Sequence, residues 1–300
     1  MSKAPFFLIM VAVLTTAITM PAMAQFGPGA GSKEIVIKDR KFDPGDPATI
    51  PKRYIADIKS NPWMVALIGK RSARLEREQF CGGVLVAPDL VLTAAHCLDI
   101  RRGLVKLTTL DLDVVIGVEN YKKGGERIPV KKIIRHEQYI PGNFNDIALL
   151  VLSRTSREGK PIKLMPADPS LPVGEEVRVT GWGRMTPHKS EAYSDILLKT
   201  DVPILGEEAC YQKMLNPYVR KRGMARQMVK RVFCAGFESG AEDSCNGDSG
   251  GPAYFVLNGE PTLVGLVSWG PLECGAPRKY GVYTRISYYH DWIVGKMANP

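Results

Sequence analysis

Short runs of apolar and β-favouring residues recur along the chain, and turn-forming residues separate them. These runs lie at residues 63–68, 83–86, 90–93, 131–134, 147–152, 176–180 and 262–269. Their length and composition predict β-strands. Because long helical patterns do not alternate with them, a parallel α/β sheet is disfavoured, and an antiparallel barrel or sandwich is favoured.

Two segments depart from the strand pattern. Residues 287–297 contain no proline, and their large apolar side chains fall on roughly one helical face: Tyr289, Trp292, Ile293 and Met297. This predicts an α-helix near the C-terminus. Residues 25–49 are rich in glycine and proline, which disfavours regular structure, so we interpret them as a linker or pro-segment.

The N-terminal residues 1–24 have the pattern of a signal peptide. Lys3 precedes an apolar stretch at residues 6–18, and Ala22-Met23-Ala24 has the small residues that signal peptidase accepts. The alternative is a membrane anchor, but the stretch is shorter than the ~20 residues a spanning helix needs. We expect cleavage before Gln25 and a secreted protein, extracellular or periplasmic, without a membrane anchor. Residues 50–300 then form the folded domain.

The composition favours a disulfide-bonded globular domain without a metal site. The chain has 300 residues, of which 45% are hydrophobic, enough for a substantial core. Its six cysteines would form three disulfides in an oxidising compartment. No Cys-x-x-Cys pair occurs, and there are four histidines, so we expect no metal site and no cofactor.

The net charge of +9 raises the alternative of a nucleic-acid or surface-binding module. Part of the charge lies in one stretch from Arg220 to Arg231, which contains Arg220, Lys221, Arg222, Arg226, Lys230 and Arg231. No aromatic residues are interleaved to stack on bases, which favours a solvated loop or helix face. We hypothesise an exosite for acidic substrates there, with self-cleavage in this stretch as the alternative.

Three short motifs together predict nucleophilic catalysis. Thr93-Ala94-Ala95-His96-Cys97 offers a base, Asn145-Asp146-Ile147-Ala148 an anion that orients it, and Gly247-Asp248-Ser249-Gly250-Gly251 a nucleophile. Their order along the chain is His, Asp, Ser. Subtilisins and α/β-hydrolases carry the same groups in other orders.

In this order and context the chain resembles the chymotrypsin family of serine proteases, over about residues 50–300. The resemblance extends to Pro62-Trp63, Cys81-Gly82-Gly83, Gly181-Trp182-Gly183, Ser268-Trp269-Gly270 and Gly281-Val282-Tyr283-Thr284. It implies an all-β fold of two antiparallel Greek-key β-barrels, with the active site in the cleft between them and a C-terminal α-helix.

The resemblance also implies roles for individual residues. His96 would take the proton of Ser249, Asp146 would orient His96, and the backbone N–H groups of Gly247 and Ser249 would form the oxyanion hole. Asp243 matches the floor of the specificity pocket. Substrate would also contact Ser268, Gly270 and Gly281, whose small side chains leave room for a long basic residue. The implied activity is that of an endopeptidase cleaving after Arg or Lys.

Six cysteines allow fifteen pairings from the sequence alone. The resemblance selects Cys81 with Cys97, Cys210 with Cys234, and Cys245 with Cys274.

The segment that the family uses for activation departs from its usual pattern. A new α-amino group normally pairs with the aspartate before the catalytic serine, here Asp248. The corresponding segment reads Ile50-Pro51-Lys52-Arg53-Tyr54, preceded by Thr49. Three outcomes are open: cleavage before Ile50, cleavage that exposes Tyr54, or an active form without a new N-terminus. Because a buried Asp248 needs a cationic partner, proteolytic activation is favoured.

A second alternative for the whole chain is a catalytically silent homologue that acts as a binding protein. The retained triad and Asp243 disfavour it. The expected partners are protein or peptide substrates with Arg or Lys at the cleaved bond; no nucleic acid is expected, and the protein is expected to be a monomer. The sequence leaves calcium binding open, because loop carboxylates such as Glu119 and Glu126 are more often simply solvated.

Overall fold

The computed structural model describes residues 54–70, 78–100, 104–141, 145–167, 170–185, 193–214, 225–240, 242–271 and 273–300. The predicted signal peptide (1–24), the pro-segment or linker (25–49) and Ile50 to Arg53 lie outside these ranges, as does the first part of the basic stretch, residues 220–224. The chain divides into Met1–Val36 and Ile37–Pro300, and every described element belongs to the second unit. None of the helices in the described ranges combines the length and apolar character needed to cross a bilayer.

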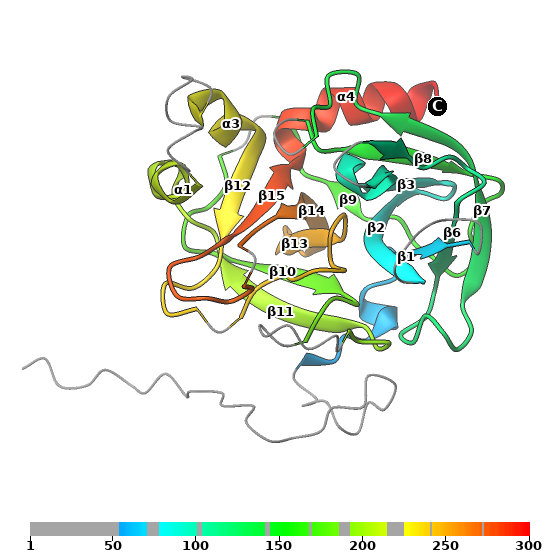
Figure 1. Ribbon diagram of the computed structural model, residues 1–300, viewed down its shortest axis with the longest axis horizontal. Helices are drawn as coiled ribbons and strands as arrows, with labels where there is room; N and C mark the ends of the chain where they lie inside the picture. The colour runs from blue at the N-terminus through cyan, green and yellow to red at the C-terminus, as the bar shows by residue number, and fades with distance from the viewer. Residues whose placement is uncertain are drawn as a thin grey trace, which may run out of the picture. The chain divides into compact units, whose positions relative to one another are not determined.

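Six strands of the N-terminal half close into a barrel (Figure 1). In barrel order they are β1 (Met64–Gly69), β2 (Gln79–Ala87), β3 (Leu90–Thr93), β8 (Ala148–Leu152), β7 (Glu126–Arg135) and β6 (Leu112–Ile116). All neighbours pair antiparallel. A small hairpin of β4 (Asp99–Ile100) and β5 (Val105–Lys106) stands outside the barrel.

The second half forms a seven-stranded sheet. Its order is β11 (Leu198–Pro203), β10 (Glu176–Gly181), β13 (Pro252–Leu257), β14 (Glu260–Trp269), β15 (Gly281–Arg285) and β12 (Val232–Ala235), and β9 (Lys163–Leu164) runs parallel to β14. A bridge from Ile204 to Ala235 links the two edge strands, so the sheet curls almost into a barrel. The predicted all-β class is confirmed, with one closed and one nearly closed sheet.

Helices are few in the described chain: the short 3-10 turns η3 (Ile58–Ser60) and η4 (Ala95–Leu98), and the α-helices α1 (Glu207–Met214), α3 (Ala225–Arg231) and α4 (Ile286–Ala298). The predicted C-terminal helix is α4. It follows β15 and reaches the first barrel, where Trp292 Nε1 donates to Glu137 at 2.9 Å and Lys296 pairs with the same carboxylate (Figure 1). The helix therefore ties the two sheets together.

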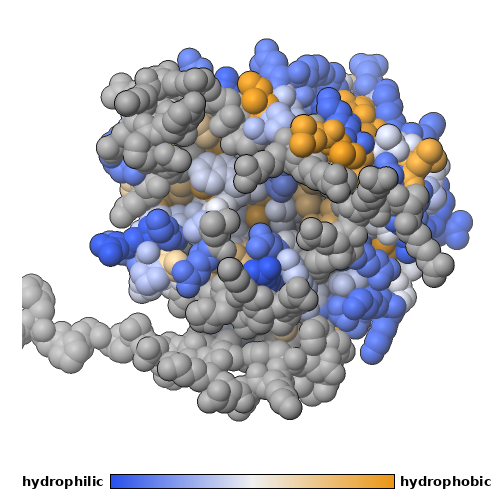
Figure 2. All heavy atoms as spheres, viewed as in Figure 1, coloured by the Kyte–Doolittle hydropathy of each residue, from blue (hydrophilic) through white to orange (hydrophobic). Residues whose placement is uncertain are grey.

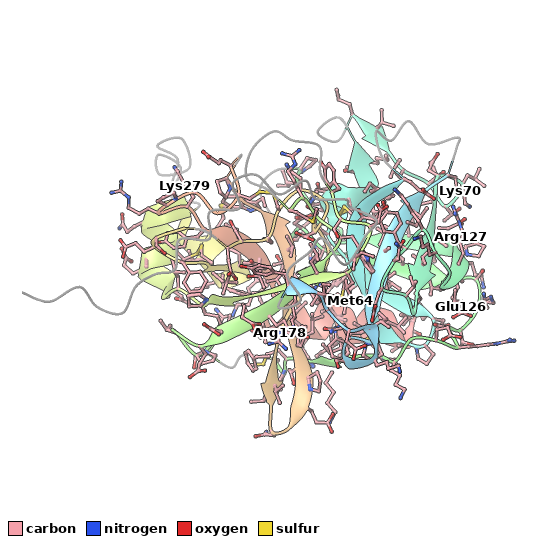
Figure 3. The ribbon with its side chains drawn as sticks, turned by 90° about the horizontal axis from the view of Figure 1, so that it is seen from below. Met64, Lys70, Glu126, Arg127, Arg178 and Lys279 are labelled. Carbon is pink, nitrogen blue, oxygen red and sulfur yellow. A yellow bond between two sulfur atoms is a disulfide. The ribbon has the colours of Figure 1, made fainter. Side chains whose placement is uncertain are left out.

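The two sheets share one continuous core. Met64 on β1 lies near the centre of the molecule (Figure 3), and its sulfur accepts a hydrogen bond from Thr180 Oγ1 on β10 at 2.9 Å. Trp63 packs edge-on against Tyr254 of β13, with ring centroids 5.0 Å apart. The Tyr254 hydroxyl donates to the side chain of buried Asn61. These contacts fix how the loops of one sheet meet those of the other.

Protein groups contact both carboxylates that the sequence places in loops, and Glu126 is the first residue of strand β7. Glu126 accepts hydrogen bonds from Arg154, from Ser156 Oγ at 2.7 Å and from Arg157 N at 2.9 Å. Burial alone would raise the pKa of Glu126, but these hydrogen bonds lower it to about 2. Glu119 accepts from the backbone N–H of Ile58 at 3.3 Å.

Apolar side chains are scattered over the described surface. Figure 2 shows a mainly hydrophilic face with small separate hydrophobic areas. The most exposed large apolar residues are Leu104 (84%), Leu110 (76%), Val173 (66%) and Val256 (65%). Single exposed apolar residues are normal for folded proteins and do not mark an interface.

Two glycines allow a test of how tightly the second sheet is packed. A Cβ at Gly265 on β14 would lie 2.5 Å from the buried Phe233 ring, whereas a Cβ at Gly295 on the exposed side of α4 would meet nothing within 4 Å. Gly265→Ala should lower the free energy of unfolding by about 1–3 kcal/mol through overpacking. Gly295→Ala should raise it by about 0.5–1 kcal/mol through helix propensity. Denaturant titration of both variants checks the pair, and equal shifts would contradict it.

Candidate active site

His96 and Asp146 meet at the edge of the first barrel. His96 lies on η4, and Asp146 lies two residues before β8. His96 Nδ1 is 2.8 Å from Asp146 Oδ2, and the backbone N–H of His96 donates to Oδ1 at 2.8 Å. Two bonds to one carboxylate fix both the position and the orientation of the imidazole.

The pair shifts the pKa of both groups. Burial alone would lower the pKa of His96, but the negative charge and hydrogen bond of Asp146, with a further contribution from Asp99, raise it. Burial alone would raise the pKa of Asp146, but His96 and the hydroxyl of Ser268 lower it. Each shift favours the charged form of one partner beside the other.

Further residues hold Asp146, and sequence reasoning assigned this role to none of them. Ser268, which the resemblance assigns to substrate contact, directs its Oγ to Asp146 Oδ2. Thr284 Oγ1 donates to the Asp146 carbonyl at 2.8 Å. The preceding residue, Asn145, has φ of 56° and is held from both ends of its amide, by Tyr289 OH at 2.9 Å and by the Gln138 carbonyl at 2.7 Å. Asparagine is among the residues that tolerate this left-handed conformation. That tolerance is the one sequence signal that could have indicated the role of Asn145.

Ser249 lies in a tight turn between the sheets. The Ser249 carbonyl accepts a hydrogen bond from Gly82 N of β2 at 2.8 Å. Gly247 has φ of 99° and Gly250 has φ of 78°, both in the region that favours glycine. A Cβ at Gly250 would lie 2.2 Å from Thr93 Oγ1, so only glycine fits there.

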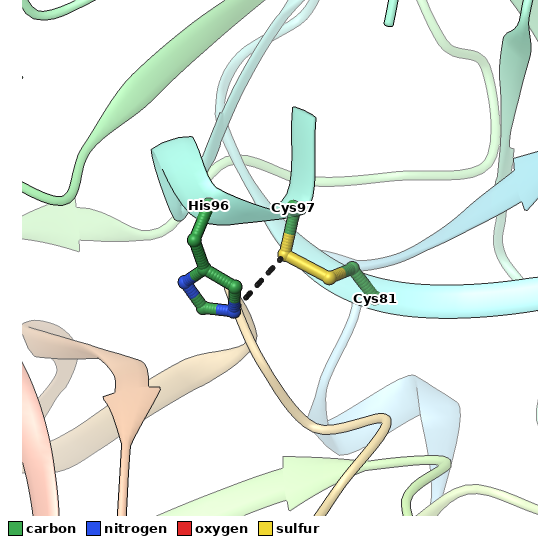
Figure 4. Close-up of side chains that lie close together, drawn as sticks. All are labelled: Cys81, His96 and Cys97. Carbon is green, nitrogen blue, oxygen red and sulfur yellow. Dashed lines mark hydrogen bonds between the residues drawn. A yellow bond between two sulfur atoms is a disulfide. The ribbon is translucent and has the colours of Figure 1, made fainter. Parts of the chain in front are cut away.

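Ser249 and His96 line the same cavity. Within the described residues, no hydrogen bond joins His96 Nε2 to the Ser249 hydroxyl; Nε2 faces Cys97 Sγ at 3.9 Å (Figure 4). Catalytic hydrogen bonds in sites without substrate are often long and tighten when substrate binds.

Cys81, His96 and Cys97 lie close enough together to suggest a metal centre. Cys81 and Cys97 are joined in a disulfide (Figure 4). Because cysteine binds a metal as a thiolate and a disulfide offers no thiolate, this cluster does not supply a zinc ligand set.

Asp248 points away from Ser249 into the second sheet. Its carboxylate accepts hydrogen bonds from Gly183 N at 2.8 Å and from Cys245 N at 2.9 Å. A Cβ at Gly181 or Gly183 would lie 2.1 Å or 2.2 Å from this carboxylate. The two glycines of the Gly-Trp-Gly motif therefore make room for it.

Asp243 has a pKa well above the usual range of a carboxyl group. Burial raises the pKa of Asp243 to about 7. A Cβ at Gly281 would lie 2.7 Å from Asp243 Oδ1. The residue after Asp243, Ser244, lines the cavity that holds Ser249, as does Gly270, while Asp243 does not itself line it.

The structure joins all six cysteines in the pairs that the resemblance implies: Cys81–Cys97, Cys210–Cys234 and Cys245–Cys274. The first bond lies beside His96. The third joins two segments that line the Ser249 cavity.

The second part of the basic stretch, residues 225–231, is described and forms helix α3. Helix α3 contains Lys230, which is exposed, and Arg231, whose guanidinium lies 5.2 Å from the Tyr288 ring centroid and donates to the Gln227 carbonyl at 2.8 Å. Arg231 also lines the Ser249 cavity. Arg220, Lys221 and Arg222 lie outside the described residues.

Comparisons with known proteins agree with this geometry. The sequence model of the family described as Trypsin matches residues 50–293. The chain is 36% identical over 240 residues to Trypsin 5G1 of Aedes aegypti, covering 79% of this chain and 80% of that protein. It is 34% identical over 243 residues to a trypsin of Phaedon cochleariae, covering 79% and 84%.

A third relative is longer than this chain. Human tissue-type plasminogen activator is 34% identical over 262 residues, which is 81% of this chain but only 43% of that protein. The segment that the family model matches contains both sheets, and the chain accordingly belongs to the trypsin family of serine proteases.

Proposed function

We propose that the protein is a secreted endopeptidase that hydrolyses peptide bonds after Arg or Lys. The observation that carries the specificity is the carboxylate of Asp243, which lies partly buried beside the Ser249 cavity. No lysine or arginine of the described residues forms an ion pair with it. A buried carboxylate is costly unless a cation pairs with it, and the side chain of a substrate Arg or Lys is that cation. Arginine can meet it with paired charge-assisted hydrogen bonds.

The reaction proceeds through an acyl-enzyme. His96 takes the Ser249 hydroxyl proton as the oxygen attacks the scissile carbonyl, and then donates it to the leaving amine. Water then loses a proton to His96 as its oxygen attacks the acyl carbon; the ester bond to Ser249 Oγ breaks, His96 returns the proton to Ser249, and the acid product leaves. Asp146 stabilises the imidazolium form of His96, which agrees with the direction of both pKa shifts.

The charge that develops on the substrate carbonyl oxygen needs donors. The backbone N–H groups of Gly247 and Ser249 serve this purpose, and the φ of 99° at Gly247 is a conformation open to glycine. The loss of one such donor typically reduces the rate by about 10²–10³.

Activation follows proteolysis that supplies Asp248 with a cationic α-amino group. Tyr54, at the start of the described chain, is anchored through its hydroxyl to Glu242 at 3.1 Å, and Ala56 N donates to the Leu197 carbonyl at 2.9 Å. N-terminal sequencing of active protein distinguishes a terminus at Ile50, a terminus at Tyr54 and an uncut chain.

Secretion is supported by the signal-like residues 1–24 and by three disulfides, which persist in oxidising compartments.

A panel of chromogenic peptides tests the activity. The matured protein should cleave peptides that end in Arg or Lys before the chromophore at least about 100-fold faster than peptides that end in Phe or Ala. Ser249→Ala should abolish cleavage while leaving the fold intact by circular dichroism. A processed wild-type protein that cleaves none of the four peptides would rule out the enzyme and favour a binding protein.

Asp243→Ser tests the pocket separately. Removing one partner of a buried charge pair costs about 2–5 kcal/mol, so kcat/KM for the Arg peptide should fall at least about 30-fold. Labelling of Ser249 by a small fluorophosphonate should be unchanged, because this reagent does not depend on the pocket. Retention of the Arg preference would reject Asp243 as its source and leave the catalytic assignment standing.

The raised pKa of Asp243 predicts how cation binding depends on pH. Below about pH 7 the carboxyl is protonated and neutral, so affinity for benzamidine should fall as the pH drops, by about tenfold per pH unit between pH 7 and 5. Isothermal titration calorimetry measures the benzamidine affinity directly. The result therefore does not depend on a reaction rate, which the protonation of His96 would also change. Asp243→Asn should bind weakly and independently of pH. A wild-type affinity that stays constant from pH 5 to 8 would contradict the assignment.

A further inference from the structure

Gln79 is a polar side chain in an apolar position. It opens β2 and is fully buried, with 0% of its surface exposed. Its amide nitrogen donates to the Cys81 carbonyl at 3.0 Å and to the Gly247 carbonyl at 2.9 Å. A buried amide is tolerated only when it is hydrogen-bonded, so these two contacts specify where Gln79 must lie.

The bond to Gly247 joins the two halves of the protein. Gln79 belongs to the first barrel, and Gly247 belongs to the turn of the second half that carries Ser249, 168 positions later. Three residues further along β2, Gly82 N donates to the Ser249 carbonyl at 2.8 Å. One strand therefore holds the carbonyl groups on both sides of Asp248.

These bonds restrain a peptide that would otherwise turn easily. Gly247 has φ of 99° and no side chain to limit its rotation. The peptide unit that follows it is held at both ends: Gln79 binds the Gly247 carbonyl, and the N–H of Asp248 donates to the Cys245 carbonyl at 3.0 Å. The N–H of Gly247 belongs to the preceding peptide unit, whose carbonyl, that of Asn246, accepts a hydrogen bond from Arg184 N at 2.9 Å. With the units on both sides of Gly247 held, its φ and ψ are restrained and its N–H keeps one direction.

We propose that Gln79 is a positioning residue for the oxyanion hole. It touches neither substrate nor Ser249 Oγ; it acts through the Gly247 peptide, and the assignment rests on the proposed peptidase function. Preorganised donors stabilise charge in the transition state because they need no reorganisation during the reaction. Loss of the Gln79 bond releases the Gly247 peptide and weakens this stabilisation, while the Asp243 pocket is left as it was.

The test replaces Gln79 by Met, which has a similar length and no donors. Gln79→Met should lower kcat for an Arg peptide anilide by about 10–100-fold, with KM changed by less than about twofold. The Ki of a peptide aldehyde that ends in arginine should rise by a similar factor, because its adduct with Ser249 places an oxygen in the oxyanion hole. The Ki of benzamidine, which fills only the pocket, should stay within about twofold.

Two controls separate positioning from a general loss of structure. Gln212→Met makes the same exchange at an exposed position on α1 and should leave every constant unchanged. Gln79→Glu keeps the shape of the side chain but has at most one donor, so it should also lower kcat. It provides the test if Gln79→Met fails to fold. Circular dichroism and benzamidine binding report the folded fraction of each variant.

The outcomes are distinct. A kcat for the folded variant within about twofold of wild type overturns the role of Gln79 alone, as does an equal loss of aldehyde and benzamidine affinity. A wild-type protein that cleaves no peptide overturns the proposed function, and this inference with it.

Discussion

The hydrogen bond from Gly82 N to the Ser249 carbonyl is the contact on which the site depends most, because it fixes one sheet against the other. His96 and Asp146 belong to the first barrel, and Ser249 belongs to the second half. No local sequence preference can set the distance from Ser249 to the pair of His96 and Asp146. A Cβ at Gly82 would lie 3.0 Å from Gly251, so the two backbones approach as closely as glycine allows.

The same constraint explains why glycines cluster around Ser249. Gly250 lies against Thr93, and Gly181 and Gly183 lie against the Asp248 carboxylate. Each is a point where a backbone from one segment passes next to another. The turn is thus held by close packing and backbone hydrogen bonds, and an added methyl group at any of these positions would push the segments apart.

Several strands, the C-terminal helix and the motifs of the candidate site could be predicted from the sequence, because each depends on residues that are close together along the chain. The strand expected at residues 90–93 is β3, and the helix expected at 287–297 is α4, which begins one residue earlier and ends one later. The motifs around His96, Asp146 and Ser249 are short, and their order along the chain was enough to identify the family. The residues that support them were not predicted. Gln79 looks like an isolated polar residue beside an apolar strand, and its partner is 168 positions away.

The disulfide Cys81–Cys97 joins β2, the strand that holds the Ser249 turn, to η4, which carries His96. The bond therefore links the segment that carries His96 to the strand that supports Ser249. In a reducing environment this link is absent, and the two segments are joined only through the barrel. A covalent link therefore reinforces the placement of His96 against the Ser249 turn only in an oxidising compartment.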